Sequence, residues 1–208
     1  MNKSTLTTIL ASISAVMTEN RDYLIQLDQQ NGDGDLGISM SDGYRAVAAF
    51  VAGAEETDLG RLLMKAALTF NEAAPSSLGT ITSFGLMGMA KALKGKTDAS
   101  FDEAADALIA GVREIMAKAN SKPGEKTILD ALWPAAEALK ANSAQGAEAA
   151  CAAAWAAAQA GAESTRAMRS VHGRAAYYGD KSIGLLDGGS VVGALIFQGI
   201  LAAVRQAG

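Results

Sequence analysis

The sequence has 208 residues, of which 50% are hydrophobic, 5% are aromatic and 19% are charged. This length suits one domain, and the apolar content excludes an intrinsically disordered chain. The 18 basic and 22 acidic residues give a net charge of −4. Because no Lys/Arg-rich run accompanies this charge, nucleic-acid binding is disfavoured.

The single cysteine, Cys151, excludes an intramolecular disulfide. Its Ala-rich surroundings predict a small buried residue rather than a nucleophile. No segment approaches the roughly 18 uninterrupted apolar residues of a membrane span. The first 24 residues have the pattern of an amphipathic helix rather than of a signal peptide. We therefore expect a cytoplasmic protein that does not bind membranes.

Apolar residues recur at helical spacing from the start of the chain. The first expected helix carries them on one face, at Leu6, Ile9, Leu10, Ile13, Val16 and Met17. Similar patterns predict eight helices, at residues 4–20, 38–54, 57–72, 80–94, 101–119, 127–141, 144–168 and 189–206. Ser100 with Glu103 forms a capping box for the fifth helix, and Thr57 with Asp58 gives the third a weaker start.

Two features depart from this regular pattern. Pro134 lies inside the sixth expected helix, where its ring would displace the carbonyl of Asp130, so we expect a kink or a late helix start. The run Tyr23–Leu27 is the one segment that tolerates a strand, and nothing else alternates to pair with it. The prediction is therefore a single all-α domain.

Four Gly-rich connections contrast with the helices, at residues 28–37, 74–79, 120–126 and 170–190. The first gathers Asp28, Asp33 and Asp35 within eight residues and separates them with glycines. Carboxylates suit hard cations such as Mg²⁺, Ca²⁺ or Mn²⁺, and the glycines allow the backbone to bring them together. The sequence favours a metal site here, with a solvated acidic turn as the alternative.

Two other motifs overlap this connection and fit poorly. Gly32, Gly34 and Gly37 match the dinucleotide fingerprint, but the intervening aspartates would oppose a pyrophosphate and no series of strands and helices follows. An EF-hand would place Leu36 where glycine is needed and Asp42 where glutamate is needed. Neither motif is expected.

The remaining connections carry weaker signals. The run GEKT at 124–127 is not a phosphate loop, because Glu125 separates the glycine from the lysine. Residues 74–79 precede Thr80 at an expected helix start, so their N–H groups and hydroxyls either bind an anion or form an ordinary capped turn. The last connection holds Arg174, Lys181 and Asp187, which suit a polar ligand.

Together the four connections resemble the nucleotide-binding L subunit, or L domain, of dihydroxyacetone kinases. The segment from Leu27 to Gly37 is similar to the metal loop of that family, with its three aspartates at matching spacing. Residues 124–134, GEKTILDALWP, are similar to its GDKT-hydrophobic-LDAL-x-P stretch. Residues 173–189 are similar to its GRA-x-Y, SIG and D-P-G elements. The matches occur in order and cover nearly the whole chain.

Three departures stand out. Leu36 replaces the histidine of the family's metal loop, and Gly188 replaces the proline of D-P-G. Residues 75–79 lack the family's Gly-Gly-x-Ser-Gly and retain Gly79, with Ser76 and Ser77 as sources of a hydroxyl.

The resemblance implies one L-type domain over residues 1–208, folded as an antiparallel up-and-down barrel of eight helices with a nucleotide at one end. It implies that Asp28, Asp33 and Asp35 hold two Mg²⁺ ions against the phosphates of ADP or ATP, with Asp35 and Arg174 as the catalytic residues. The other residues implied for nucleotide binding are Ser76, Ser77, Gly79, Thr80, Gly124, Thr127, Asp187 and Gly189, together with Arg174 as a cationic clamp.

The resemblance also implies partners. A K subunit would carry the hydroxyketone that receives the phosphoryl group, a phosphotransfer M subunit would recharge bound ADP, and a homodimer is conceivable. The single histidine, His172, lies where the family pattern asks for nothing specific. The alternative hypothesis is a regulatory subunit that senses nucleotide without transferring phosphate.

Overall fold

The computed structural model describes residues 1–207, which contain helices, turns and loops and one isolated β-bridge between Asn2 and Asp98. The all-α prediction is confirmed. Every expected helix is present, and each begins within three residues of its predicted start. The long helices are α1 (Lys3–Glu19), α3 (Leu36–Gly53), α4 (Leu59–Ala73), α5 (Ser77–Ala92), α6 (Phe101–Ala119), α7 (Leu129–Ala141), α8 (Ala147–Ser164) and α9 (Gly188–Ala207).

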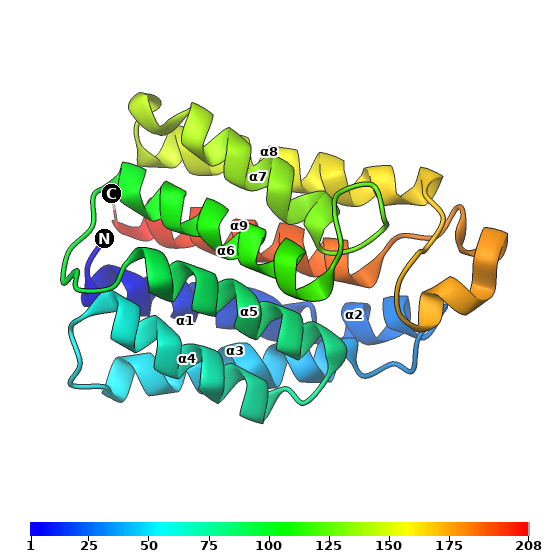
Figure 1. The fold of residues 1–208 in the computed structure, drawn as a ribbon, viewed down its shortest axis with the longest axis horizontal. Helices are drawn as coiled ribbons and strands as arrows, with labels where there is room; N and C mark the ends of the chain where they lie inside the picture. Colours follow the sequence, from blue (N-terminus) through cyan, green and yellow to red (C-terminus); the bar gives the residue numbers. More distant parts are fainter. Residues whose placement is uncertain (208) are drawn as a thin grey trace.

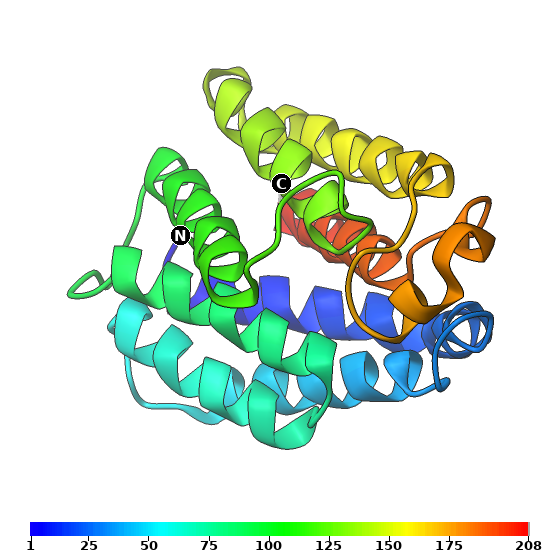
Figure 2. The same cartoon turned by 45° about the vertical axis from the view of Figure 1, so that its right-hand side comes forward.

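Helices that follow one another along the chain pack side by side from α3 to α9, and α1 packs against both α3 and α9. The start of α1 and the end of α9 lie at one end of the bundle, on the left of Figure 1. All four Gly-rich connections lie at the opposite end, on the right, and the turned view agrees (Figures 1 and 2). The fold thus collects at one end the loops that the sequence separates.

The interior between the helices is apolar and holds a partly open cavity of about 660 Å³. All eight long helices contribute to its lining, which includes Ile13, Tyr44, Ile115, Leu132, Cys151 and Ile200. None of the residues that line it belongs to the four Gly-rich connections. Burial raises the pKa of the Cys151 thiol to about 11, so this side chain packs as a small apolar group, as predicted.

One short helix was not expected. The strand-tolerant run Tyr23–Leu27 lies inside α2 (Arg21–Asp28), which buries Leu24 and Leu27 and exposes Tyr23. Burial at a spacing of three residues is helical, but eight residues are too few for the sequence pattern to reveal it. This helix matters because its last residue, Asp28, opens the acidic loop.

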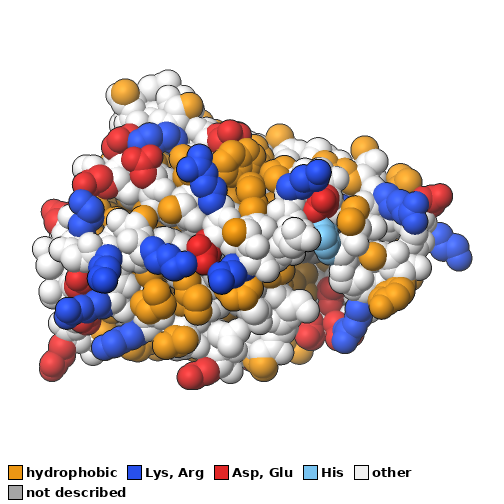
Figure 3. All heavy atoms as spheres, in the orientation of Figure 1, with side chains coloured by type: hydrophobic (Ala, Val, Ile, Leu, Met, Phe, Trp, Pro, Cys, Tyr) orange, Lys and Arg blue, Asp and Glu red, His pale blue; other side chains and the backbone are white. Residues whose placement is uncertain are grey.

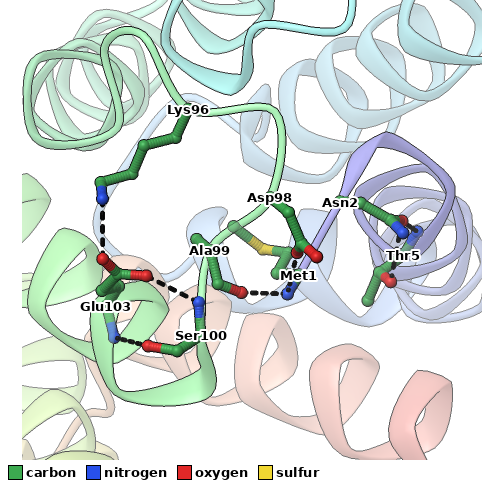
Figure 4. A network of polar contacts seen from close by, with 8 residues as sticks. All are labelled: Met1, Asn2, Thr5, Lys96, Asp98, Ala99, Ser100 and Glu103. Atoms are coloured by element: carbon green, nitrogen blue, oxygen red, sulfur yellow. Dashed lines mark hydrogen bonds and ion pairs between the residues drawn. The ribbon is translucent and has the colours of Figure 1, made fainter.

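The capping signals give the predicted helix starts. Ser100 accepts the Glu103 N–H, and Glu103 accepts the Ser100 N–H in return, which completes the capping box of α6 (Figure 4). The other oxygen of Glu103 accepts from Lys96, and Asn2 caps α1 by accepting the Thr5 N–H. Asp58 caps α4 through the Arg61 N–H. Each cap satisfies N–H groups that the first turn leaves free.

Helix α7 begins late, at Leu129, so Pro134 lies six residues into it. Proline has no N–H, and the carbonyl of Asp130 therefore receives no helical hydrogen bond from position 134. Gly161 of α8 lies against this same carbonyl, and a Cβ atom at position 161 would overlap it. The proline and the glycine together allow α7 and α8 to approach closely.

By length and composition, α9 is apolar enough to cross a membrane, although 56% of its most apolar window is buried within this structure. It packs against α1, α7 and α8. On the face of the molecule in Figure 3, acidic and basic side chains are interspersed, with apolar side chains between them.

Candidate functional site

The acidic connection brings the three predicted carboxylates together. Asp28 ends α2, Asp35 immediately precedes α3, and Asp33 lies in the turn between them. One carboxylate oxygen from each lies within 4.8 Å of the other two. Three negative charges at this separation repel one another, and a hard cation with oxygen ligands would relieve the repulsion. The donor set therefore fits Mg²⁺.

The glycines of this loop shape the backbone around Asp28. Gly34 adopts a φ of +78°, in the left-handed region, and its N–H donates to a carboxylate oxygen of Asp28 at 2.7 Å. The Gly32 N–H donates to the backbone carbonyl of Asp28 at 2.6 Å. A Cβ atom at position 32 would overlap the Asp28 carboxylate. The turn is thus wrapped around the first aspartate, as the glycine spacing predicted.

Arg174 is distant from this loop in the sequence but contacts it in the fold. It begins the 3₁₀ segment η3 (Arg174–Ser182), which lies beside the α2–α3 loop in both ribbon views (Figures 1 and 2). Its guanidinium forms an ion pair with the carboxylate of Asp33. The predicted cationic clamp and the predicted metal loop are therefore in contact.

The start of α5 offers a second anion-binding element. Ser76 caps this helix by accepting the Gly79 N–H at 3.1 Å. This cap explains why the helix begins at Ser77 rather than at the predicted Thr80. The hydroxyl of Thr80 donates to Asn71 on α4, so it is already engaged. Among the described residues no acceptor is paired with the N–H groups of Ser77 and Leu78, which are therefore available to an anion.

The third connection folds around the carboxylate of Asp130. One oxygen accepts the Gly124 N–H at 2.5 Å, and the other accepts the Thr127 N–H at 2.7 Å. The hydroxyl of Thr127 accepts the Leu129 N–H. These two backbone donors therefore shape the turn, and direct nucleotide contacts by Gly124 and Thr127 stay a prediction.

Asp187 connects the fourth loop to the rest of the site. Its carboxylate accepts the Ser190 N–H at 2.6 Å at the start of α9, and its own N–H donates to Thr165. Burial raises its pKa to about 7, and the negative charges of Asp130 and Asp28 add to the rise. The Ser190 N–H and the Lys126 ammonium oppose it. Gly189 approaches this carboxylate so closely that a Cβ atom there would lie 3.1 Å from it.

Two residues at this end were not selected from the sequence. Glu125 accepts from His172 at 2.7 Å, and this contact is the main reason that its pKa is lowered to about 2. Lys126 donates to three backbone carbonyls of the fourth connection. Both contacts join segments that are distant in the sequence, so no local pattern could reveal them.

Residues 30–202 match the sequence profile of the DAK2 domain family. The chain belongs to the DAK2 domain family. The match spans most of the chain and includes all four Gly-rich connections in whole or in part, so the family resemblance inferred from their motifs is confirmed.

Relatives of this DAK2 domain carry kinase names. It is 29% identical over 202 residues to the ADP-binding subunit DhaL of PEP-dependent dihydroxyacetone kinase 2 from Listeria innocua. The match covers 96% of this chain and 94% of that protein. It is 30% identical over 203 residues to triokinase/FMN cyclase from Rattus norvegicus, of which it spans 35%.

The fold has a counterpart of known structure. The DAK2 domain superposes with a TM-score of 0.75 on the dihydroxyacetone kinase from C. freundii, crystallised with AMP-PNP and Mg²⁺. The sequences are 24% identical, and the match covers 94% of this chain and 33% of that one. The two chains therefore share this helical fold.

Proposed function

We propose that this chain is the nucleotide-binding subunit of a hydroxyketone kinase of the dihydroxyacetone kinase type. The observation that carries the proposal is the convergence of Asp28, Asp33 and Asp35 within 4.8 Å at the end of the bundle where Arg174 meets them. The names of the relatives, which include an ADP-binding subunit of a dihydroxyacetone kinase, support the same assignment.

The three aspartates would hold two Mg²⁺ ions against the phosphates of ADP or ATP. When bound, Mg²⁺ neutralises phosphate oxygens and stabilises the charge that develops as a phosphoryl group is transferred. Asp28 is preorganised for this role by the Gly34 N–H, which fixes one of its oxygens. Asp35 lies at the start of α3 and its side chain does not cap that helix, which leaves its carboxylate free to bind a cation.

The phosphates themselves would be held by the N–H groups of Ser77 and Leu78 at the start of α5 and by Arg174. A helix N-terminus favours anions, and a guanidinium engages phosphate oxygens in pairs. A cation bound at Asp33 would replace the positive charge that Arg174 supplies there, so the guanidinium would be released toward the phosphate. Asp35 and Arg174 are thus the two residues proposed to act on the transferred group.

Calorimetric titration of Mg²⁺-ADP tests the nucleotide site. Asn in place of Asp33 or Asp35 removes one negative charge and keeps the shape, and we expect each change to weaken binding by at least about tenfold. Asp22→Asn is the matched control, because this side chain on α2 is 86% exposed and pairs with Arg21 alone among the described residues. Equal affinities for the wild type and both loop variants would overturn the proposed site.

The partner of this subunit would be a K-type subunit that carries the hydroxyketone, in the cytoplasm, with either an M-type subunit or ATP as the phosphoryl source. The docking rim would come from the loops around residues 35–42, 76–80 and 174–187.

The phosphoryl group would pass directly from the nucleotide to the substrate. With partner subunits and a labelled donor, His172→Ala should retain activity within a few-fold and Asp35→Asn should abolish it. Acid-labile label on this chain that His172→Ala removes would contradict direct transfer.

A nucleotide-sensing regulatory subunit is the second candidate. The observation in its favour is the altered loop before α5, where the Ser76 hydroxyl caps the helix and the Thr80 hydroxyl is bonded to Asn71. Two of the three hydroxyls at residues 76–80 are therefore already hydrogen-bonded within the protein. A sensor would bind Mg²⁺-nucleotide and move no phosphoryl group when K-type and M-type subunits are added, whereas a kinase subunit would transfer it.

A further inference from the structure

Lys126 is buried although it carries a charge, with 3% of its surface exposed. Its backbone adopts a φ of +59°, in the left-handed region that residues with a Cβ atom rarely occupy. Asn120 is the other residue besides glycine that does so within residues 1–207. The side chain points to the connection that precedes α9, whose carbonyls it contacts.

The ammonium group of Lys126 is fully hydrogen-bonded to backbone. It donates to the carbonyls of Met168, Ser182 and Leu185 at 3.1, 2.6 and 2.7 Å. An ammonium has three N–H donors, so these bonds use all of them. No carboxylate within the described part of the chain lies within 4 Å of Lys126, so the contact is not an ion pair. Burial lowers the pKa of Lys126, and the charge of Asp187 partly opposes this effect.

The three carbonyls lie at the base of a loop. Residues 166–170 and 182–185 run alongside each other: the Ser170 N–H donates to the Ser182 hydroxyl at 2.9 Å, and the Gly184 N–H donates to the Arg166 carbonyl at 2.8 Å. Lys126 joins both sides of this base, with Met168 on one side and Ser182 and Leu185 on the other. Residues 171–181 project beyond the base, and we call them the loop tip.

The loop tip reaches the acidic loop through Arg174, which pairs with Asp33. The side chain of Arg174 is about two-thirds exposed, so its surroundings other than Asp33 do little to fix it. Its position depends on where the base of the loop is held. Without the ammonium, three carbonyls would lose a donor and the base would keep only the bonds between residues 166–170 and 182–185. The base would then open more often, so placing Arg174 over the site would cost more conformational entropy.

We propose that Lys126 is a positioning residue, which fixes the base of the 166–185 loop and thereby holds Arg174 at the nucleotide site. The inference rests on the proposed nucleotide-binding function and adds to it a residue that touches neither metal nor phosphate. It also explains the lysine of the GEKT run, which resembles a phosphate-binding lysine and instead donates to backbone carbonyls.

The first test measures the loop without nucleotide. Met in place of Lys126 keeps the length of the side chain and removes the ammonium. We expect trypsin to cleave after Lys181 at least about fivefold faster in this variant, because the loop base opens more often. Lys122→Met is the matched control, since Lys122 is an exposed lysine of the same connection. An unchanged cleavage rate in Lys126→Met would overturn the proposal.

The second test is a double-mutant cycle that combines Lys126→Met with Arg174→Ala. The Mg²⁺-ADP affinity of each protein is measured with nucleotide concentrations up to the millimolar range. If Lys126 acts through Arg174, Lys126→Met should weaken binding by about tenfold in the wild type and less than about twofold in the Arg174→Ala background. Equal effects in both backgrounds would indicate a general structural role and would overturn the proposal. If Lys126→Met does not fold, Lys126→Gln, which keeps a donor, replaces it in both tests.

The affinity of the wild type for Mg²⁺-ADP distinguishes a failure of this proposal from a failure of the proposed function on which it rests. A wild type that binds Mg²⁺-ADP, with additive effects in the cycle, would overturn the role of Lys126 and leave the nucleotide site in place. A wild type that does not bind Mg²⁺-nucleotide would overturn both.

Discussion

The Cδ2 atom of Leu36 lies 2.5 Å from the position that a Cβ atom would occupy on Gly188. These two residues begin α3 and α9, and both depart from the family pattern, which has histidine and proline at these places. The two departures are therefore in contact. Leu36 fills space that a side chain at position 188 would need, so a larger residue at 188 requires a smaller one at 36.

This contact predicts coupling between the two positions. Proline is favoured at the first residue of a helix and restricts the unfolded chain, so Gly188→Pro alone should gain at most about 0.4–1 kcal/mol from that effect. The collision with Leu36 should cancel the gain. In a Leu36→Ala background the same change should be more favourable by at least about 0.5 kcal/mol. Urea unfolding of the four proteins measures the coupling, and additive free energies would contradict it.

The contact between Arg174 and Asp33 predicts that the loop tip is protected by ligand. Trypsin should cut after Arg174 and Lys181 early in the free protein and several-fold more slowly with Mg²⁺-ADP. Arg174→Lys keeps the charge and the cleavage site but loses the planar fork, so protection should weaken although the fold survives. Arg61→Lys, on exposed α4 surface, is the control. Identical rates with and without nucleotide would show that this loop does not close over the site.

The raised pKa of Asp187, about 7, predicts a pH dependence of stability. A carboxyl group whose pKa is higher in the folded state favours folding while it is protonated. Its contribution is therefore lost as pH rises from about 4 through about 7. In metal-free buffer, Asp187→Asn should raise the melting temperature at pH 8 and change it little at pH 4. If the melting temperatures of the wild type and the variant differ by the same amount at pH 4 and pH 8, the raised pKa of Asp187 is contradicted.

The close approach of α8 to α7 predicts opposite effects for two glycine substitutions. Gly161→Ala should lower the free energy of unfolding by about 1–3 kcal/mol, because the new methyl group would meet the Asp130 carbonyl. Gly53→Ala, at the end of α3, should be neutral or stabilising by up to about 1 kcal/mol, because beyond its chain neighbours and its own helix backbone no atom lies within 4 Å of its Cβ position. Chemical denaturation of both variants checks this pair, and similar effects would show that the contact has no cost.

The sequence by itself determined the helices and the acidic loop. Helical periodicity and capping depend on residues three and four positions apart, so the Ser100–Glu103 box and the eight long helices could be read locally. Asp28, Asp33 and Asp35 are close in sequence, and the glycines between them favour a tight turn. Their convergence is a local property of the chain.

Only the tertiary structure decided which loops meet. The contact of Arg174 with Asp33, the bonds from Lys126 to Met168, Ser182 and Leu185, and the packing of Leu36 on Gly188 join residues that no short pattern connects. Antiparallel packing of the helices places these loops at one end, and burial there sets the pKa of Asp187. Hydrogen bonds and charges between loops depend on distances that helix packing fixes, which is why residue order alone could not specify them.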